Sequence, residues 1–127
     1  MSWDIVLFKA DRKVDLQDPQ IENYLQLFDF NSAIEMHFRE IEKSVDFWEI
    51  IGDGYSINYY PDNQKCTHTM VNLYGEKGLF ELIQLARKHN LQIYDSGLDD
   101  FLDLEHPENN GYKNFIGYVK QIMEKEK

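Results

Sequence analysis

Residues 47–60, FWEIIGDGYSINYY, carry the clearest β signal in the chain, because two β-rich runs flank a tight turn there. Asp53-Gly54 suits the positive backbone φ that two-residue hairpin loops require. After the turn, large apolar residues alternate with Ser56 and Asn58, which is typical of a strand with one buried face. The stretch therefore predicts an antiparallel hairpin.

Further strands are predicted on both sides of this hairpin. Thr67 to Tyr74 is another β-rich run beyond the turn at Pro61-Asp62-Asn63, so three consecutive strands form a meander. Trp3 to Phe8 is apolar on both faces, which favours an interior strand. Leu91 to Tyr94 predicts one more strand, with Phe101 to Leu104 as its possible partner.

Apolar residues at helical spacing predict the helices. They are a short helix after Asp18-Pro19 that runs to Phe28, a longer one from Ala33 to Lys43 capped by Ser32, one from Leu79 to His89 with Asn90 just beyond it, and a closing one from Tyr112 to Met123. The predicted fold class is α+β, a single domain over residues 1–127. An antiparallel β-meander sheet with additional strands is covered by three to four helices, as a single pair of layers.

The charge of the chain narrows the range of its partners. Thirteen Lys and Arg against twenty-three Asp and Glu give a formal net charge of -10. Such a surface repels nucleic acid and anionic membranes and raises encounter rates with a basic protein. The alternative is that the acidity only maintains solubility.

Other features of the chain bear on its compartment. Cys66 is the only cysteine, so no internal disulfide forms, and the first residues lack the pattern of a secretory leader. No apolar run approaches the roughly 20 residues of a membrane-spanning helix. We therefore expect a soluble, cytoplasmic protein.

The densest polar feature is an acidic run of six carboxylates between residues 95 and 108, without Lys or Arg between them. As a metal site it lacks the spacing of a calcium loop, and as an acid/base pair its loop residues look solvated. As an interaction face, carboxylates would steer a basic partner around apolar anchors. The predicted partner-binding residues are Asp99, Asp100, Asp103 and Glu105 for steering, with Leu98 and Phe101 as the anchors.

Three other patterns favour structural roles. Cys66 and His68 lie two apart in a predicted strand, where a thiol and an imidazole do not readily hydrogen-bond, and further zinc ligands are missing. The segment Gly75-Glu76-Lys77-Gly78 matches no phosphate-binding motif. The aromatic residues of the meander favour a core face. We therefore predict no catalytic residue, cofactor or metal ligand.

The chain also resembles small uncharacterised bacterial proteins. The resemblance is carried by MSWDIVLF at residues 1–8 and by residues 78–95. Some proteins of this kind accompany polymorphic-toxin systems as immunity proteins. The resemblance implies a compact acidic domain that blocks a basic toxin by binding it, and it transfers no active-site residue.

Together these observations predict a non-enzymatic binding protein, of the immunity or inhibitor type, that neutralises a basic bacterial toxin. Two alternatives from other classes stay open. One is a small metal-dependent hydrolase that uses the acidic run with His106, and the other is a structural homo-oligomer formed through exposed aromatics or a sheet edge. The sequence leaves the oligomeric state and the strand order undetermined.

Overall fold

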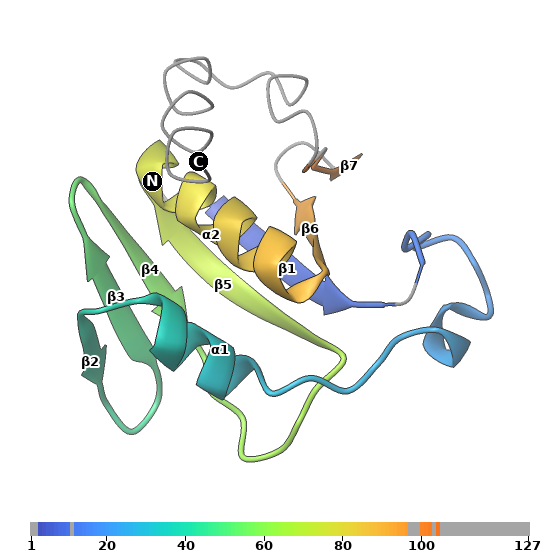
Figure 1. Ribbon diagram of the computed structural model, residues 1–127, viewed down its shortest axis with the longest axis horizontal. Coiled ribbons are helices and arrows are strands. Elements are labelled where there is room, and N and C mark those ends of the chain that lie inside the picture. The colour runs from blue at the N-terminus through green and yellow to red at the C-terminus, as the bar shows by residue number, and fades with distance from the viewer. Residues whose placement is uncertain (1–2, 11, 97–99, 103, 105–127) are drawn as a thin grey trace.

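A computed structural model describes residues 3–10, 12–96, 100–102 and 104, which form one antiparallel sheet with helices on one face (Figure 1). The elements in chain order are β1 (Trp3–Lys9), a 3-10 turn (Ile21–Asn23), α1 (Phe30–His37), β2 (Ile41–Lys43), β3 (Trp48–Gly52), β4 (Tyr55–Tyr59), β5 (His68–Tyr74), α2 (Glu76–His89), β6 (Leu91–Asp95) and β7 (Asp100–Phe101). The strand order is β2-β3-β4-β5-β1-β6-β7.

The sheet confirms the predicted hairpin and extends the meander. β3 and β4 pair around the Asp53-Gly54 turn, with Gly54 at φ 82°, and β4 pairs in turn with β5. β1 is an interior strand as predicted, because β5 and β6 pair with its two edges. Phe101 pairs with Tyr94, so the predicted contact between these two segments is also confirmed.

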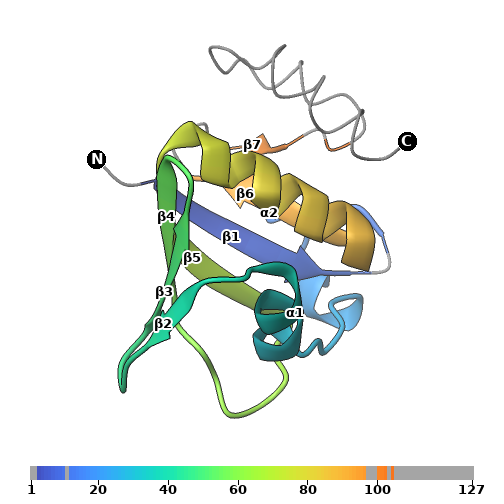
Figure 2. The same cartoon turned by 60° about the vertical axis from the view of Figure 1, so that its left-hand side comes forward.

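The prediction of three to four covering helices is wrong. Among the described residues there are two α-helices, and strands dominate. Both helices lie on the same face of the sheet, as the turned view makes plain (Figure 2). The predicted closing helix at 112–123 lies outside the described residues.

The predicted helix from Ala33 to Lys43 combined two different elements. α1 begins three residues earlier and is capped by Asp29, not by Ser32: the Asp29 carboxylate accepts the Ser32 backbone N–H at 3.1 Å and the Ser32 hydroxyl at 2.8 Å. The helix ends because Phe38 is extended and inserts into the core with 7% exposure. The chain then continues as β2, and Val45, two residues beyond the end of the predicted helix, is fully exposed.

The predicted short helix that runs to Phe28 is reduced to the single 3-10 turn. Leu25 and Phe28 instead form isolated β-bridges with Ala10 and Cys66. Phe28 and Cys66 exchange backbone hydrogen bonds of 2.8 and 3.1 Å. The apolar spacing here arises from packing: a small cluster of Phe8, Ala10, Val14 and Tyr24 buries this segment against the end of the sheet.

The main core lies between the sheet and the two helices. It includes Ile5, Leu7, Ile50, Ile57, Val71 and Leu73 from the strands and Leu79, Leu82 and Ile83 from α2, all with 0% exposure. α2 ends at Asn90, which adopts the left-handed conformation at φ 57° that helix C-termini favour. None of the helices in the described part of the chain has the length and apolar character needed to cross a membrane.

Candidate functional site

The structure places only part of the predicted partner-binding site. Leu98, Asp99, Asp103 and Glu105 lie outside the described residues. Asp100 is in β7, and Phe101 packs its ring against Phe8 and Tyr94, with ring centroids 5.8 and 5.3 Å apart. Phe101 also lines a surface depression of about 520 Å³ together with residues 13–17. This site therefore stays a prediction.

Asp95, the first carboxylate of the acidic run, has a different environment from a solvated loop. It ends β6 opposite Ile5 and is 2% exposed. Because β-strand side chains alternate between faces, Asp95 shares the helix-covered face with Ile93. It is therefore not part of an exposed acidic surface.

Cys66 and His68 do not form a nucleophile pair. The Cys66 thiol donates to the Gln64 carbonyl at 3.4 Å, and the His68 imidazole contacts the Thr67 hydroxyl at 3.0 Å and stacks on Phe8. Burial raises the pKa of the Cys66 thiol, which keeps it protonated and a poor nucleophile. No group of three or more His, Cys, Asp or Glu within the described ranges is placed to hold a metal ion.

The glycines at the start of α2 make room for an aromatic ring. A Cβ on Gly78 would lie 2.8 Å from the Tyr55 ring and 2.5 Å from Leu73, and one on Gly75 would lie 2.7 Å from the Gly54 carbonyl oxygen. Gly75 also has φ 98°, which L side chains rarely adopt. The glycines of this segment therefore serve close packing around Tyr55.

One ionisable pair joins the two helices. His37 Nε2 on α1 lies 3.2 Å from Glu81 Oε2 on α2, and both side chains are partly buried. Tyr55 lies close to the same carboxylate, and burial together with Glu81 raises the pKa of Tyr55 to about 12. The phenol therefore stays protonated at neutral pH. The His37–Glu81 pair links α1 to α2.

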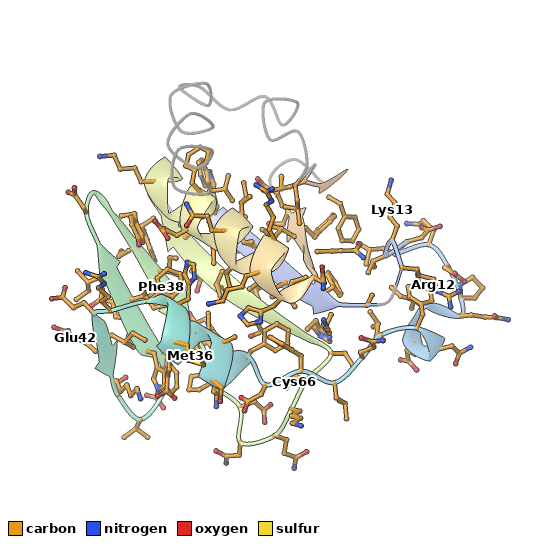
Figure 3. All side chains as sticks on the ribbon, viewed as in Figure 1. Arg12, Lys13, Met36, Phe38, Glu42 and Cys66 are labelled. Carbon is orange, nitrogen blue, oxygen red and sulfur yellow. The ribbon has the colours of Figure 1, made fainter. Side chains whose placement is uncertain are left out.

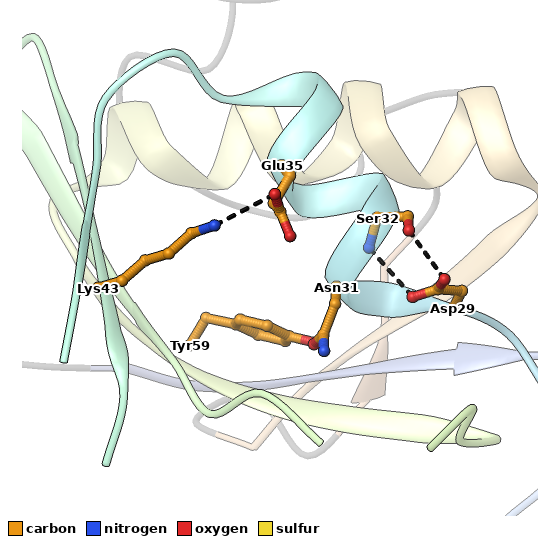
Figure 4. Close-up of polar contacts among 6 residues, drawn as sticks. All are labelled: Asp29, Asn31, Ser32, Glu35, Lys43 and Tyr59. Atoms are coloured by element: carbon orange, nitrogen blue, oxygen red, sulfur yellow. Dashed lines mark hydrogen bonds and ion pairs between the residues drawn. The ribbon is translucent and has the colours of Figure 1, made fainter. Parts of the chain in front are cut away.

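Polar contacts also fix α1 to the sheet (Figure 4). The Tyr59 hydroxyl on β4 donates to Asn31 Oδ1 at 2.5 Å, and Asn31 Nδ2 donates to the Asp62 carbonyl at 2.8 Å. Lys43 on β2 forms an ion pair with Glu35 on α1 at 3.1 Å and lies over the Trp48 ring. These contacts place Lys43 on the helix-covered face.

The other face of the sheet carries a different set of side chains. A single line of register runs from β2 to β1 through Glu42, Glu49, Asn58, Asn72 and Asp4. Their strand neighbours Ile50, Ile57, Val71 and Ile5 belong to the core, so the five side chains point away from the helices. We call these five residues the acidic row.

Apolar side chains flank the acidic row on both sides. Met70 lies two residues before Asn72, and Tyr60 lies two residues after Asn58. Tyr74 lies two residues after Asn72. Their exposed fractions are 46%, 43% and 39%. We call Tyr60, Met70 and Tyr74 the anchor group, and we call the acidic row together with the anchor group the open face.

Charge is separated between the two faces of the sheet. In β1 to β5 the carboxylates of Asp4, Glu42 and Glu49 belong to the open face. Both lysines of these strands lie on the helix side, where Lys9 donates to the His89 carbonyl at 2.7 Å and Lys43 pairs with Glu35. The described strands therefore project no Lys or Arg from the open face.

Sequence reasoning missed the open face although a signal for it was present. The aromatic residues of the meander were assigned to a core, and Trp48, Tyr55 and Tyr59 do belong to or pack against it. Tyr60 and Tyr74 are exposed instead. Strand alternation from Val71 and Leu73 would have placed Met70, Asn72 and Tyr74 together on the opposite face.

No protein-family model, curated protein or solved structure matches this chain.

Proposed function

We propose that this protein is a non-enzymatic binding protein of the immunity or inhibitor type, which neutralises a basic protein by docking against it. The observation that carries the proposal is the separation of charge between the two faces of the sheet. Carboxylates and exposed apolar side chains share the open face, while the strand lysines are held on the other. Apolar contacts surrounded by charge are typical of protein interfaces.

Charge also favours one class of macromolecule as the partner. A net charge of -10 opposes nucleic acid and anionic lipid, and it accelerates association with a cationic protein. The basic residues Arg12 and Lys13 lie at the opposite end of the molecule from Glu42 (Figure 3). The carboxylates of the open face would orient a basic partner as the two approach.

The proposal is tested by capturing the partner on the immobilised full chain. Lysate of the native cells is passed over it at low salt, and retained proteins are identified by mass spectrometry. We expect one basic protein, released as the ionic strength rises because screening weakens the attraction. The captured protein is then produced in growing cells with and without this chain.

Growth arrest by the partner alone, relieved when both proteins are present, would support a neutralising role. Retention of acidic proteins only, or a basic protein whose effect on growth is the same with and without this chain, would contradict the proposal. A lysate depleted of metal ions serves as a control. The same basic protein should be retained from it, because a binding protein of this kind needs no metal cation to retain its partner.

A further inference from the structure

We propose that the open face is the surface on which the basic partner docks, with the anchor group buried at the contact and the acidic row pairing with the partner's cations. This inference rests on the proposed function and goes further, because it assigns the contact to one face of the five strands β1 to β5. The acidic run at 95–108 is a separate segment of the chain.

The arrangement of the open face suits a contact with an apolar centre and charged surroundings. The acidic row crosses five strands, and its carboxylates stand at the two ends, with Asp4 on β1 and Glu42 and Glu49 on β2 and β3. The amides of Asn58 and Asn72 lie between them. Met70, Tyr60 and Tyr74 flank this middle section, so apolar surface and hydrogen-bonding groups coincide there.

The two carboxylates at the β2 edge are placed against each other. Glu42 and Glu49 are directly opposite in the register, a position in which like charges oppose sheet pairing. The nearest lysine in sequence, Lys43, points to the other face and is paired with Glu35. A cation from a partner would relieve this repulsion, so the pair favours a basic occupant.

A hydrogen-bonded chain holds part of the open face in place before any partner arrives. The Tyr60 hydroxyl donates to Asn72 Oδ1 at 2.5 Å, and Asn72 Nδ2 donates to Asp4 Oδ1 at 2.8 Å. The chain links the end of β4 to β5 and β1. Because these side chains are already ordered, binding loses less conformational entropy at them.

Charge disfavours a second copy of this protein as the occupant. In a dimer built face to face, each acidic row would meet another surface without Lys or Arg from its strands. Like charges brought together across an interface oppose association. A partner with arginines or lysines around an apolar patch has the complementary chemistry.

The test uses a defined probe and the isotope-labelled full chain in solution NMR. The probe is an eight-residue peptide that alternates arginine with leucine, and the control replaces each arginine with glutamate. We expect the basic peptide to shift amide signals of the anchor group and the acidic row, and the acidic peptide to leave them unchanged.

Paired variants then separate charge from apolar contact. Glu42→Gln with Glu49→Gln should weaken peptide binding about fivefold at low salt, as expected for two exposed ion pairs. Glu22→Gln with Asp53→Asn removes the same charge from two exposed turn positions outside the open face, and affinity should stay within about twofold.

The anchor group is tested in the same way. Met70→Ala or Tyr74→Ala should weaken binding of the captured basic protein about tenfold, because truncating a buried contact costs about 1.4 kcal/mol. Met36→Ala is the matched control, since Met36 lies on α1 with 77% exposure and is outside the open face. Thermal melts confirm that each variant is folded.

Some results would overturn the proposed surface and leave the proposed function standing. These are amide shifts that map to residues 98–105, or open-face variants that bind the captured protein as tightly as the native chain. A dimer in sedimentation that Met70→Lys disrupts would assign the open face to a second copy. Failure to capture any basic protein would instead contradict the proposed function itself.

Discussion

The bond between Tyr59 and Asn31 offers a quantitative test of how α1 is held on the sheet (Figure 4). Tyr59 is 1% exposed, so its hydroxyl depends on Asn31 for a partner. Asn31 also donates to the Asp62 carbonyl, so this one side chain links α1 to both β4 and the loop before β5.

The sizes of the effects follow from this geometry. Tyr59→Phe removes one hydrogen bond and should cost about 1 kcal/mol of unfolding free energy. Asn31→Ala removes two and leaves the buried Tyr59 hydroxyl without an acceptor, so we expect a loss of about 3 kcal/mol. In the Tyr59→Phe background the hydroxyl is already absent, and the same Asn31→Ala change should cost only about 1 kcal/mol.

The assay is a double-mutant cycle measured by guanidinium chloride unfolding. Removing Asn31 should therefore cost about 2 kcal/mol less when Tyr59 is already Phe. Thermal melts give an independent reading, because 1 kcal/mol shifts the melting temperature of a domain of this size by about 4 °C. Additive costs, with a coupling below about 0.3 kcal/mol, would refute the inferred link.

Three further predictions concern packing and pH. Gly78→Ala should destabilise the fold by about 2 kcal/mol, although alanine usually favours a helix, because the new methyl group would collide with Tyr55 and Leu73; a gain in unfolding free energy would contradict this packing. Because the folded-state pKa of Tyr55 is raised to about 12, stability should fall as the pH rises above about 10, and Tyr55→Phe should reduce that loss in alkaline unfolding curves. Burial and two nearby lysines lower the pKa of His89, so the unfolded chain takes up the proton first as the pH falls. The free energy of unfolding should therefore decrease below about pH 6.5. Unfolding measured at pH 7.5 and 5.5 should show this decrease in the native chain and a smaller one in His89→Gln.

Local signals in the sequence predicted most of the strands, with the exception of β2, which fell inside a predicted helix. The Asp53-Gly54 turn specifies its hairpin through a backbone conformation that few residues adopt, and Asn90 ends α2 for the same reason. The apolar character of both faces of Trp3 to Phe8 indicated a strand paired on both edges. In each case the information lies within a few neighbouring residues.

Helices were predicted less well because apolar residues at helical spacing indicate that residues are buried, but not whether a helix or a strand buries them. Ile34, Phe38 and Ile41 are spaced as on one helix, yet Phe38 leaves α1 to enter the core and Ile41 pairs with Ile50 in the sheet. Leu25 and Phe28 are likewise placed by β-bridges to distant residues. Whether such a residue joins a helix or pairs in a sheet depends on contacts with residues that are distant in the sequence.

The charge of this protein, its hairpin and the alternation of its strands can be read from the chain alone, because they depend on composition and on backbone preferences of adjacent residues. Which strand faces form the core and which carboxylates come together depends on the assembled fold. Glu42, Asn72 and Asp4 lie far apart in the chain and share one line only through strand register. Register is set by burying one face of every strand at once, and that is a property of the assembled sheet.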